Sequence, residues 1–303
     1  MRRRAVLARL LLACAALLPS AAWAQNLLWQ VSSLTNHVYL FGTIHVGRPE
    51  WYPLPVAVNE ALADSNELAV EADITDRKAI AETGAGTTYT PPDSLANHVS
   101  KEDFARFVRL LPNYHLPERE IVQMKPFMAV SLLVFAEWAR LGYVPELGVD
   151  GYLISRARAE LKPVVELEGV REQVKLMDSL TDAQNRTLFA STLGAIESGL
   201  TDEQIKGTVR AWQVGDPQAL LEVAQRYEAQ VKGSAELDEK FIWSRNAAMV
   251  DKIAAWLDGS RDPRFVAVGA LHLVGPRGIV ELLRKRGYVV RQIFVAPPVE
   301  KKQ

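Results

Sequence analysis

The chain has 303 residues, of which 49% are hydrophobic and 23% are charged, and it contains one cysteine. A chain of this length can bury a core without disulfides, and one cysteine excludes a disulfide framework within the chain. The formal net charge of −1 gives no electrostatic footprint for nucleic acid.

Residues 1–24 have the pattern of a cleavable signal peptide. Residues 2–4 are arginines, residues 5–18 are apolar apart from Arg9, and Ala22-Trp23-Ala24 is an A-x-A cleavage site. The apolar run is too short for a stable transmembrane helix, and no later apolar stretch reaches that length. We therefore expect a mature chain of residues 25–303, without an integral membrane segment, that is periplasmic or secreted.

Two further features of this leader bear on the export route. The pair Arg3-Arg4 resembles a twin-arginine signal, which would mean export after folding, but ordinary secretory signals often carry arginine pairs too. Cys14 ends a lipidation-like Leu-Ala-Cys box, yet the apolar run continues past it to the cleavage site, which argues against a lipoprotein. Cleavage removes four arginines and the cysteine, so the mature chain has 31 basic and 36 acidic residues, a net charge of −5. No thiol then remains as a nucleophile or metal ligand.

Strand signals lie near both ends of the mature chain. Segments rich in β-branched, aromatic or other apolar residues predict strands at residues 27–31, 37–41, 68–72, 162–168, 265–268 and 288–295. The first two predict a hairpin around a turn at residues 32–36. No linker or shift in composition marks a domain boundary. We therefore predict one α/β domain over residues 25–303, with a central mixed sheet built from strands near both ends and a large helical insertion between them.

Helical patterns fill most of the remaining chain. The predicted helices cover residues 53–63, 127–141, 150–161, 234–257 and 276–285, and another begins at Ser100. Thr181 with Gln184, and Thr201 with Gln204, form two further helix-initiating capping boxes. Residues 84–97 are rich in Gly, Thr and Pro and predict a loop.

Two segments at opposite ends of the chain share one pattern. Residues 38–47 and 266–275 each consist of a buried strand, then Gly-x-x-His, then a glycine two or three residues later. The histidines are His45 and His272, and the glycines are expected to let the backbone turn at the end of each strand. Ligand sites in open α/β sheets form at the carboxyl ends of the strands, and imidazole is a common metal ligand. A lone histidine beside an apolar strand is usually structural, but the duplication favours one shared functional site. His37, His98 and His115 lack such a setting and are expected at the surface.

Two histidines make half a metal site, and carboxylates are the expected other half. Glu71 lies inside the strand predicted at residues 68–72, where an acid is costly to bury without a partner. Glu168 ends the strand at residues 162–168, and Glu166 has the same parity and would point to the same face. Glu166 and Asp73 have an equally good interpretation as solvent-facing residues. Asp150 lies near a turn, where a helix N-cap role is the stronger interpretation.

Arg245 and Asn246 interrupt the apolar stripe of the helix predicted at residues 234–257. A polar pair on that stripe is either a buried salt-bridge partner or an anion clamp that faces the site.

The sequence motifs of several other enzyme classes are absent. The chain has no His-Glu-x-x-His, no Gly-x-Ser-x-Gly and no phosphate-binding Gly-x-x-x-x-Gly-Lys.

The sequence resembles the TraB/GumN family, which also includes the pheromone-shutdown proteins and the animal Tiki proteins. The matching segments span nearly the whole mature chain: residues 40–47, 70–73, 124–126, 148–153, 162–164, 167–168, 245–246 and 269–272. The family's Leu-Glu-Thr is Leu-Glu-Gly at residues 167–169, which keeps the acid. The resemblance implies a fold related to erythromycin esterase and the haem-binding ChaN-like proteins. It also implies a metal-dependent peptidase that uses its Gly-x-x-His motifs and a glutamate, here His45, His272 and Glu71, with Glu168 as a further member.

The leading functional hypothesis is an exported metal-dependent hydrolase, most simply a peptidase. His45, His272, Glu71 and Glu168 would supply the ligands of a divalent ion such as Mn, Co or Zn, and a glutamate outside its ligands would act as general base. Arg245 and Asn246 would stabilise the oxyanion or hold the peptide. Two alternatives use the same cleft: a non-catalytic protein that binds a peptide, iron or haem, and an esterase-like hydrolase. For haem the sequence offers little, since it contains no Cys-x-x-Cys-His.

Overall fold

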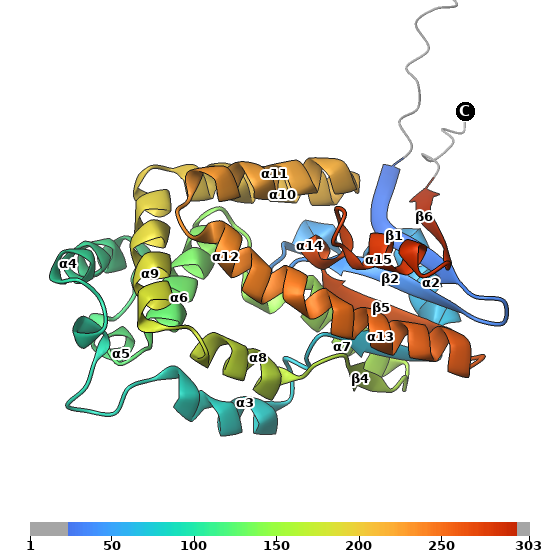
Figure 1. The fold of residues 1–303 in the computed structure, drawn as a ribbon, viewed down its shortest axis with the longest axis horizontal. Coiled ribbons are helices and arrows are strands. Elements are labelled where there is room, and N and C mark those ends of the chain that lie inside the picture. The colour runs from blue at the N-terminus through green and yellow to red at the C-terminus, as the bar shows by residue number, and fades with distance from the viewer. Residues whose placement is uncertain (1–23, 296–303) are drawn as a thin grey trace, which may run out of the picture.

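The computed structural model of the protein describes residues 24–295 (Figure 1). Residues 1–23, which hold nearly all of the predicted signal peptide, and residues 296–303 lie outside this part. Among the described helices, none has the length and apolar character needed to cross a bilayer.

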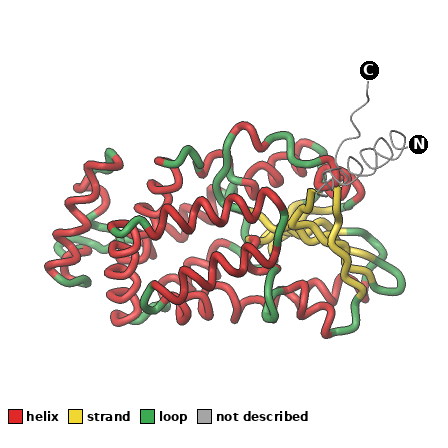
Figure 2. The backbone as a smooth tube through the Cα atoms, turned by 90° about the horizontal axis from the view of Figure 1, so that it is seen from above, coloured by secondary structure: helices red, strands yellow, loops and turns green. Residues whose placement is uncertain are grey.

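A six-stranded sheet forms one end of the described chain (Figure 2). Its strands are β1 (Ala24–Ser32), β2 (His37–Thr43), β3 (Glu67–Val70), β4 (Val164–Glu166), β5 (Arg264–Gly269) and β6 (Val289–Val295). They lie in the order β4-β3-β5-β2-β1-β6. The predicted mixed sheet, drawn from strands near both ends of the chain, is confirmed.

Strands β2, β3, β4 and β5 pair in parallel, while β1 is antiparallel to both of its neighbours, β2 and β6. Strand β5 lies between β2 and β3, and residues 265–268 are fully buried, as expected for a central strand covered on both faces. Because four neighbouring strands run the same way, their carboxyl ends meet at one edge of the sheet.

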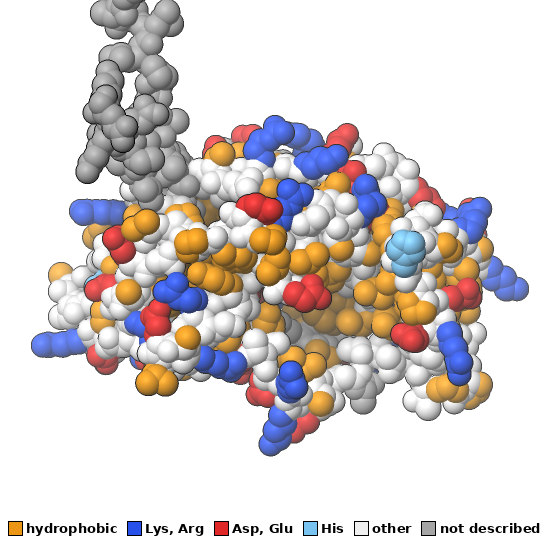
Figure 3. Space-filling model, turned by 180° about the vertical axis from the view of Figure 1, so that it is seen from behind, with side chains coloured by type: hydrophobic (Ala, Val, Ile, Leu, Met, Phe, Trp, Pro, Cys, Tyr) orange, Lys and Arg blue, Asp and Glu red, His pale blue; other side chains and the backbone are white. Residues whose placement is uncertain are grey.

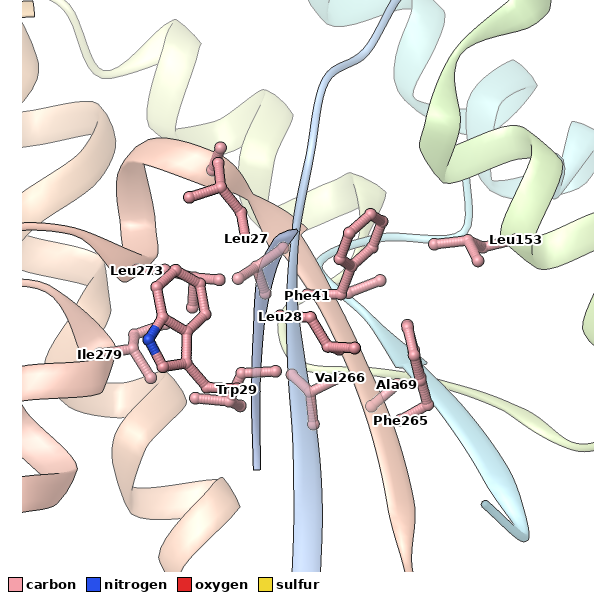
Figure 4. Packing of buried hydrophobic residues seen from close by; sticks show 14 of the residues in the cluster. Leu27, Leu28, Trp29, Phe41, Ala69, Leu153, Phe265, Val266, Leu273 and Ile279 are labelled. Atoms are coloured by element: carbon pink, nitrogen blue, oxygen red, sulfur yellow. The ribbon is translucent and has the colours of Figure 1, made fainter. Parts of the chain in front are cut away.

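Helices cover both faces of the sheet. Figure 1 shows α13 (Ser244–Gly259) and α15 (Ile279–Lys285) in front of it, and α2 (Val56–Asp64) and α7 (Val149–Ala159) behind it. Figure 4 shows Trp29, Leu273 and Ile279 packed on one face and Phe41 and Leu153 on the other. Each fully buried side chain of this kind contributes roughly 1.5–3 kcal/mol, so the two layers hold the strand ends in place.

The helical insertion extends away from the sheet (Figures 1 and 2). Its larger helices are α3 (Arg77–Gly84), α4 (Lys101–Leu110), α6 (Pro126–Arg140), α8 (Val170–Asp178), α9 (Asp182–Glu197), α10 (Leu200–Val214) and α11 (Pro217–Gln230). The shorter ones are α5 (Glu118–Ile121) and α12 (Ser234–Asp238), whereas the short helix α14 (Ala270–Leu273) follows β5 at the edge of the sheet. A second buried cluster, which includes Phe107, Leu133 and Phe189, forms the core of this helical lobe. On the face opposite to that of Figure 1, hydrophobic side chains gather in a central hollow with charged side chains around it (Figure 3).

Most predicted elements are found, with four differences. Thr181 and Gln184 form the expected capping box, but Thr201 lies inside α10, whose N-cap is Gly199 in the left-handed region. Helix α3 (residues 77–84) was not predicted, and its last residue, Gly84, is the first residue of the predicted loop at residues 84–97. The long helix predicted at residues 234–257 is divided by a π-helical turn, Glu239–Trp243, between α12 and α13. Asp150 is not an N-cap, because it lies in the first turn of α7 after Gly148.

Candidate active site at the strand ends

Four of the predicted site residues follow the carboxyl ends of the parallel strands. Glu71 comes directly after β3, His45 and Glu168 come two residues after β2 and β4, and His272 comes three residues after β5. The sheet topology thus brings together residues that are far apart in the sequence. Arg245 and Asn246 reach the same place from the first turn of α13.

His45 projects from the loop after β2, and its side chain is 63% exposed. Its Nδ1 lies 2.9 Å from Oδ2 of Asp150, whose other oxygen accepts a 2.6 Å hydrogen bond from the Thr43 hydroxyl. The Asp150 carboxylate raises the pKa of His45 to about 9, although solvent at this exposed ring screens the interaction. The N-cap interpretation of Asp150 is thus wrong, and Asp150 lies in the candidate site beside His45. With Nδ1 engaged, Nε2 is the ring nitrogen left for a ligand.

His272 lies in the short helix α14 and is 5% exposed. Its Nδ1 is 2.6 Å from Oδ1 of Asn246, and the Asn246 amide nitrogen donates to the backbone carbonyl of Arg277 at 2.9 Å. An amide that donates through its nitrogen presents an acceptor to the ring, so Nδ1 of His272 carries the proton. Burial lowers the pKa of His272 below its usual range, which keeps the ring neutral with its lone pair on Nε2.

Glu71 is the buried carboxylate between the two histidines. Its Oε1 accepts a 2.6 Å hydrogen bond from the backbone N–H of Gly269, and its Oε2 lies 3.6 Å from Nε2 of His272. Burial by itself would raise the pKa of Glu71, but His272, His45 and Arg245 outweigh it and lower the pKa to about 2. Glu71 is therefore a carboxylate at every physiological pH.

Arg245 joins the two glutamates. Its Nη2 donates to Oε2 of Glu71 at 2.6 Å and to Glu168, and its Nε lies 2.9 Å from Oε1 of Glu168. Nη1 lies 3.3 Å from Nε2 of His272. Of the two interpretations of the Arg245–Asn246 pair, Arg245 thus makes the buried salt bridge. Gln173 of α8 adds weak contacts to Glu71 and Glu168 at 3.3 and 3.4 Å, and no sequence pattern had singled it out.

Glu166 differs from Glu168 despite the shared parity. The strand β4 ends at Glu166, so the alternation of faces does not extend to Glu168. Glu166 is exposed and accepts a hydrogen bond from the backbone of Asp73 at 2.7 Å, which supports the solvent-facing interpretation for it.

We call His45, Glu71, Glu168, Arg245 and His272 the cluster, and Gly269 lies against it. A β-carbon at this position would lie 3.2 Å from Oε1 of Glu71, 3.6 Å from Cδ2 of His272 and 3.9 Å from Nε2 of His45. These groups thus surround one point. Neither Gly42 nor Gly269 has a positive φ, so the expected role in a sharp turn is wrong for both. Both glycines are needed instead for close approach, since a β-carbon on Gly42 would lie 3.0 Å from Cα of Ala270.

His45, His272 and Glu71 offer donor atoms of the types that bind divalent ions. These are the Nε2 atoms of two imidazoles whose Nδ1 atoms are held by partners, and one ionised carboxylate. Within residues 24–295, however, no group of three or more His, Asp or Glu side chains stands in the geometry of a metal site. Arg245 instead neutralises both glutamates. The side chains that would supply ligands are present, and Arg245 is the group that competes for them.

A cavity of about 470 Å³ opens beside the cluster. Residues that follow the strand ends, including His45, Glu71 and His272, form one part of its lining, and residues of the helical lobe, including Phe127 and Leu176, form another. The cluster therefore lies between the two parts of the molecule.

A protein-family model for the TraB/PrgY/gumN family matches residues 27–292. The chain belongs to this family. A protein of Escherichia coli (strain K12) named Uncharacterized protein YbaP is 26% identical over 256 residues, which cover 82% of this chain and 88% of that protein. No solved structure matches the chain.

Relatives of the family include animal proteins named as metalloproteases. The Metalloprotease TIKI homolog of Amphimedon queenslandica is 25% identical over 94% of this chain and 68% of its own length. Metalloprotease TIKI1 of Homo sapiens is 23% identical over 93% of this chain and 65% of its own length. The predicted family resemblance is thus confirmed.

Proposed function

We propose that the protein is a metal-dependent hydrolase that cleaves peptides. The observation that carries this proposal is the convergence of His45, His272 and Glu71 around Gly269, with each imidazole held through its Nδ1. The animal relatives named as metalloproteases support the reaction class. His45, His272 and Glu71 would hold the ion, which when bound would lower the pKa of a water molecule and polarise the scissile carbonyl.

The other residues have supporting roles in this proposal. Asp150 and Asn246 orient His45 and His272 through their Nδ1 atoms and are positioning residues. Both oxygens of Glu168 contact Arg245, so Glu168 serves to hold Arg245 rather than to take a proton. The guanidinium is then fixed beside the histidines, where its charge would stabilise a developing oxyanion.

The test is hydrolysis of a peptide library by the purified mature protein loaded with Mn, Co or Zn. Glu71→Gln keeps the shape of the side chain but removes its charge, and we expect it to abolish cleavage. Glu166→Gln is the matched control, because this exposed carboxylate lies outside the cluster, and it should cleave as the wild type does. A wild-type protein that cleaves no peptide with any of the three metals would contradict the proposal and favour a non-catalytic binding protein.

We also propose that the protein acts outside the cytoplasm, on the basis of the signal-peptide pattern of residues 1–24. N-terminal sequencing of the protein expressed from its full-length gene should start at Gln25. An N-terminus at Met1 on the isolated protein would contradict export by this leader.

A further inference from the structure

The lining of the cavity beside the cluster includes two chemically different groups of residues. Its ionisable residues are His45, Glu71, Asp150, Arg245 and His272, all at the strand ends or beside them. Its large apolar residues come mainly from three elements of the lobe: α6, α8 and the π-helical turn Glu239–Trp243. They include Phe127, Phe135, Trp138, Leu176, Met177 and Phe241. We call the part of the cavity that they line the apolar chamber.

We propose that the apolar chamber binds a large aromatic or aliphatic side chain of a peptide, at the residue that flanks the scissile bond. This inference rests on the proposed function for its location at the scissile bond. It adds the substrate class that the cluster would accept.

The first argument is the connection between the chamber and the polar cluster. The rings of Phe127 and Phe241 pack at a centroid distance of 5.3 Å, which joins α6 to the π-helical turn. The backbone carbonyl of Phe241 accepts a 2.5 Å hydrogen bond from Nη1 of Arg245. The wall of the chamber and the guanidinium are therefore one hydrogen bond apart. Single π-helical turns inside α-helices are frequent at functional sites, and here the turn sets this position.

The second argument is apolar surface left in water. Phe135 is 39% exposed and Ile74 is 50% exposed, and both line the cavity. Apolar area gains roughly 25 cal/mol per Å² when a ligand covers it, so these two residues favour an apolar occupant.

The third argument is charge. The charged groups of the described lining have opposite partners within the protein: His45 pairs with Asp150, and Arg245 pairs with Glu71. A charged substrate side chain in the chamber would lose its hydration without gaining a partner. The chamber therefore selects an uncharged side chain. A volume of about 470 Å³ lies within the range of whole-ligand cavities, so it also accommodates a large side chain.

The experiment uses four internally quenched peptides that differ only at the residue flanking the scissile bond, which is Phe, Leu, Gly or Asp. With the metal-loaded protein, kcat/KM for the Phe and Leu peptides should exceed that for the Gly peptide by about 100-fold or more, and the Asp peptide should be cleaved least. Equal rates for the Phe and Gly peptides would overturn the inference. A medium-chain acyl ester cleaved faster than every peptide would overturn it in favour of a lipid-like substrate.

A pair of variants tests whether the apolar chamber determines the preference for the Phe peptide over the Gly peptide. Phe135→Ala should lower kcat/KM for the Phe peptide by about tenfold and leave that for the Gly peptide unchanged. Phe294→Ala is the matched control, because Phe294 has a similar exposure of 48% on β6 and does not line the cavity. If both variants behave alike, the chamber does not set the preference and the inference fails.

A binding measurement separates this inference from the proposed function. The same Phe and Gly peptides are titrated into protein kept free of metal by EDTA, with isothermal titration calorimetry as the readout. Binding of the Phe peptide at least tenfold tighter, with no cleavage under any condition, would support the chamber and contradict the hydrolase. Cleavage without any preference in binding or rate would support the hydrolase and contradict the chamber.

Discussion

The segments that end at His45 and His272 share the pattern Gly-x-x-His but differ in backbone, exposure and partner. After β2 the chain continues as a loop, and the His45 side chain is 63% exposed and paired with a carboxylate. After β5 the chain enters α14, and the His272 side chain is 6% exposed and held by an amide. The repeated motif therefore holds each imidazole through the same atom, Nδ1, in two different local structures. Because one histidine is exposed and the other is buried, we expect their substitutions to affect stability differently.

The largest expected effect comes from removing either ring. His45→Ala and His272→Ala should each lower kcat/KM by more than about 100-fold, because each removes a proposed metal ligand. Their effects on stability should differ. His272→Ala should lower the free energy of unfolding by about 1–3 kcal/mol, because it leaves the buried Oδ1 of Asn246 without its hydrogen-bond donor, whereas the exposed His45→Ala should lower it little. Urea unfolding measures this difference, and equal losses would contradict the comparison.

Replacing Asp150 or Asn246, which hold Nδ1 of His45 and His272, should have a smaller effect than removing either imidazole. Asp150→Asn and Asn246→Leu should each lower metal affinity by about 10–100-fold, since partners of this kind orient metal-binding imidazoles. Asp64→Asn is the matched control, because Asp64 holds His37 at 3.0 Å, away from the cluster. Metal competition titrations give these affinities. An Asp150→Asn protein that binds metal as the wild type does would show that His45 needs no carboxylate behind it.

Alanine substitutions at Gly42 and Gly269 should separate an effect on stability from an effect on activity. Gly42→Ala places a β-carbon 3.0 Å from a backbone atom of Ala270 and should lower the free energy of unfolding by about 1–3 kcal/mol. Gly269→Ala crowds Glu71 at 3.2 Å and should lower activity by about tenfold with a smaller loss of stability. In Gly259→Ala, the control, the new β-carbon meets nothing within 4 Å. Thermal unfolding and peptide cleavage would be measured for all three, and the opposite ranking would contradict the comparison.

The smallest expected effect is that the imidazoles of His45 and His272 titrate in different pH ranges in protein treated with EDTA. The pKa of His45 is raised from 6.5 to about 9, so its contribution to stability is complete below pH 6.5 and is lost as the pH rises through about 9. The pKa of His272 is lowered, so stability is instead lost as the pH falls below 6.5 and the unfolded chain takes up the proton. NMR of the imidazole C–H protons should show the two rings titrating on opposite sides of pH 6.5. Two rings that titrate together would contradict the assignment.

The sequence predicted the sheet and the main members of the cluster because both depend on local signals. Buried strands have continuous apolar runs, and an acid or a histidine directly after such a run must lie at the sheet edge. The parallel pairing of β2, β3, β4 and β5 then brings these residues together.

Other parts of the site depend on packing and could not be predicted in this way. Asp150 has the same local sequence signal as a helix N-cap, and only the position of α7 against β2 brings it to His45. Gln173 and the π-helical turn carry no pattern of their own. The apolar chamber consists of residues on three elements, each of which resembles an ordinary core residue when its element is considered alone.

The central claim is that His45 and His272 hold one divalent ion between them, and metal content tests it most directly. The mature protein, the double variant His45→Ala/His272→Ala and the control His37→Ala/His98→Ala are each incubated with Mn, Co or Zn, desalted and measured by inductively coupled plasma mass spectrometry. We predict about one ion per chain in the wild type and the control, and none in the double variant. A wild type without bound metal, or a double variant that retains it, would contradict the claim.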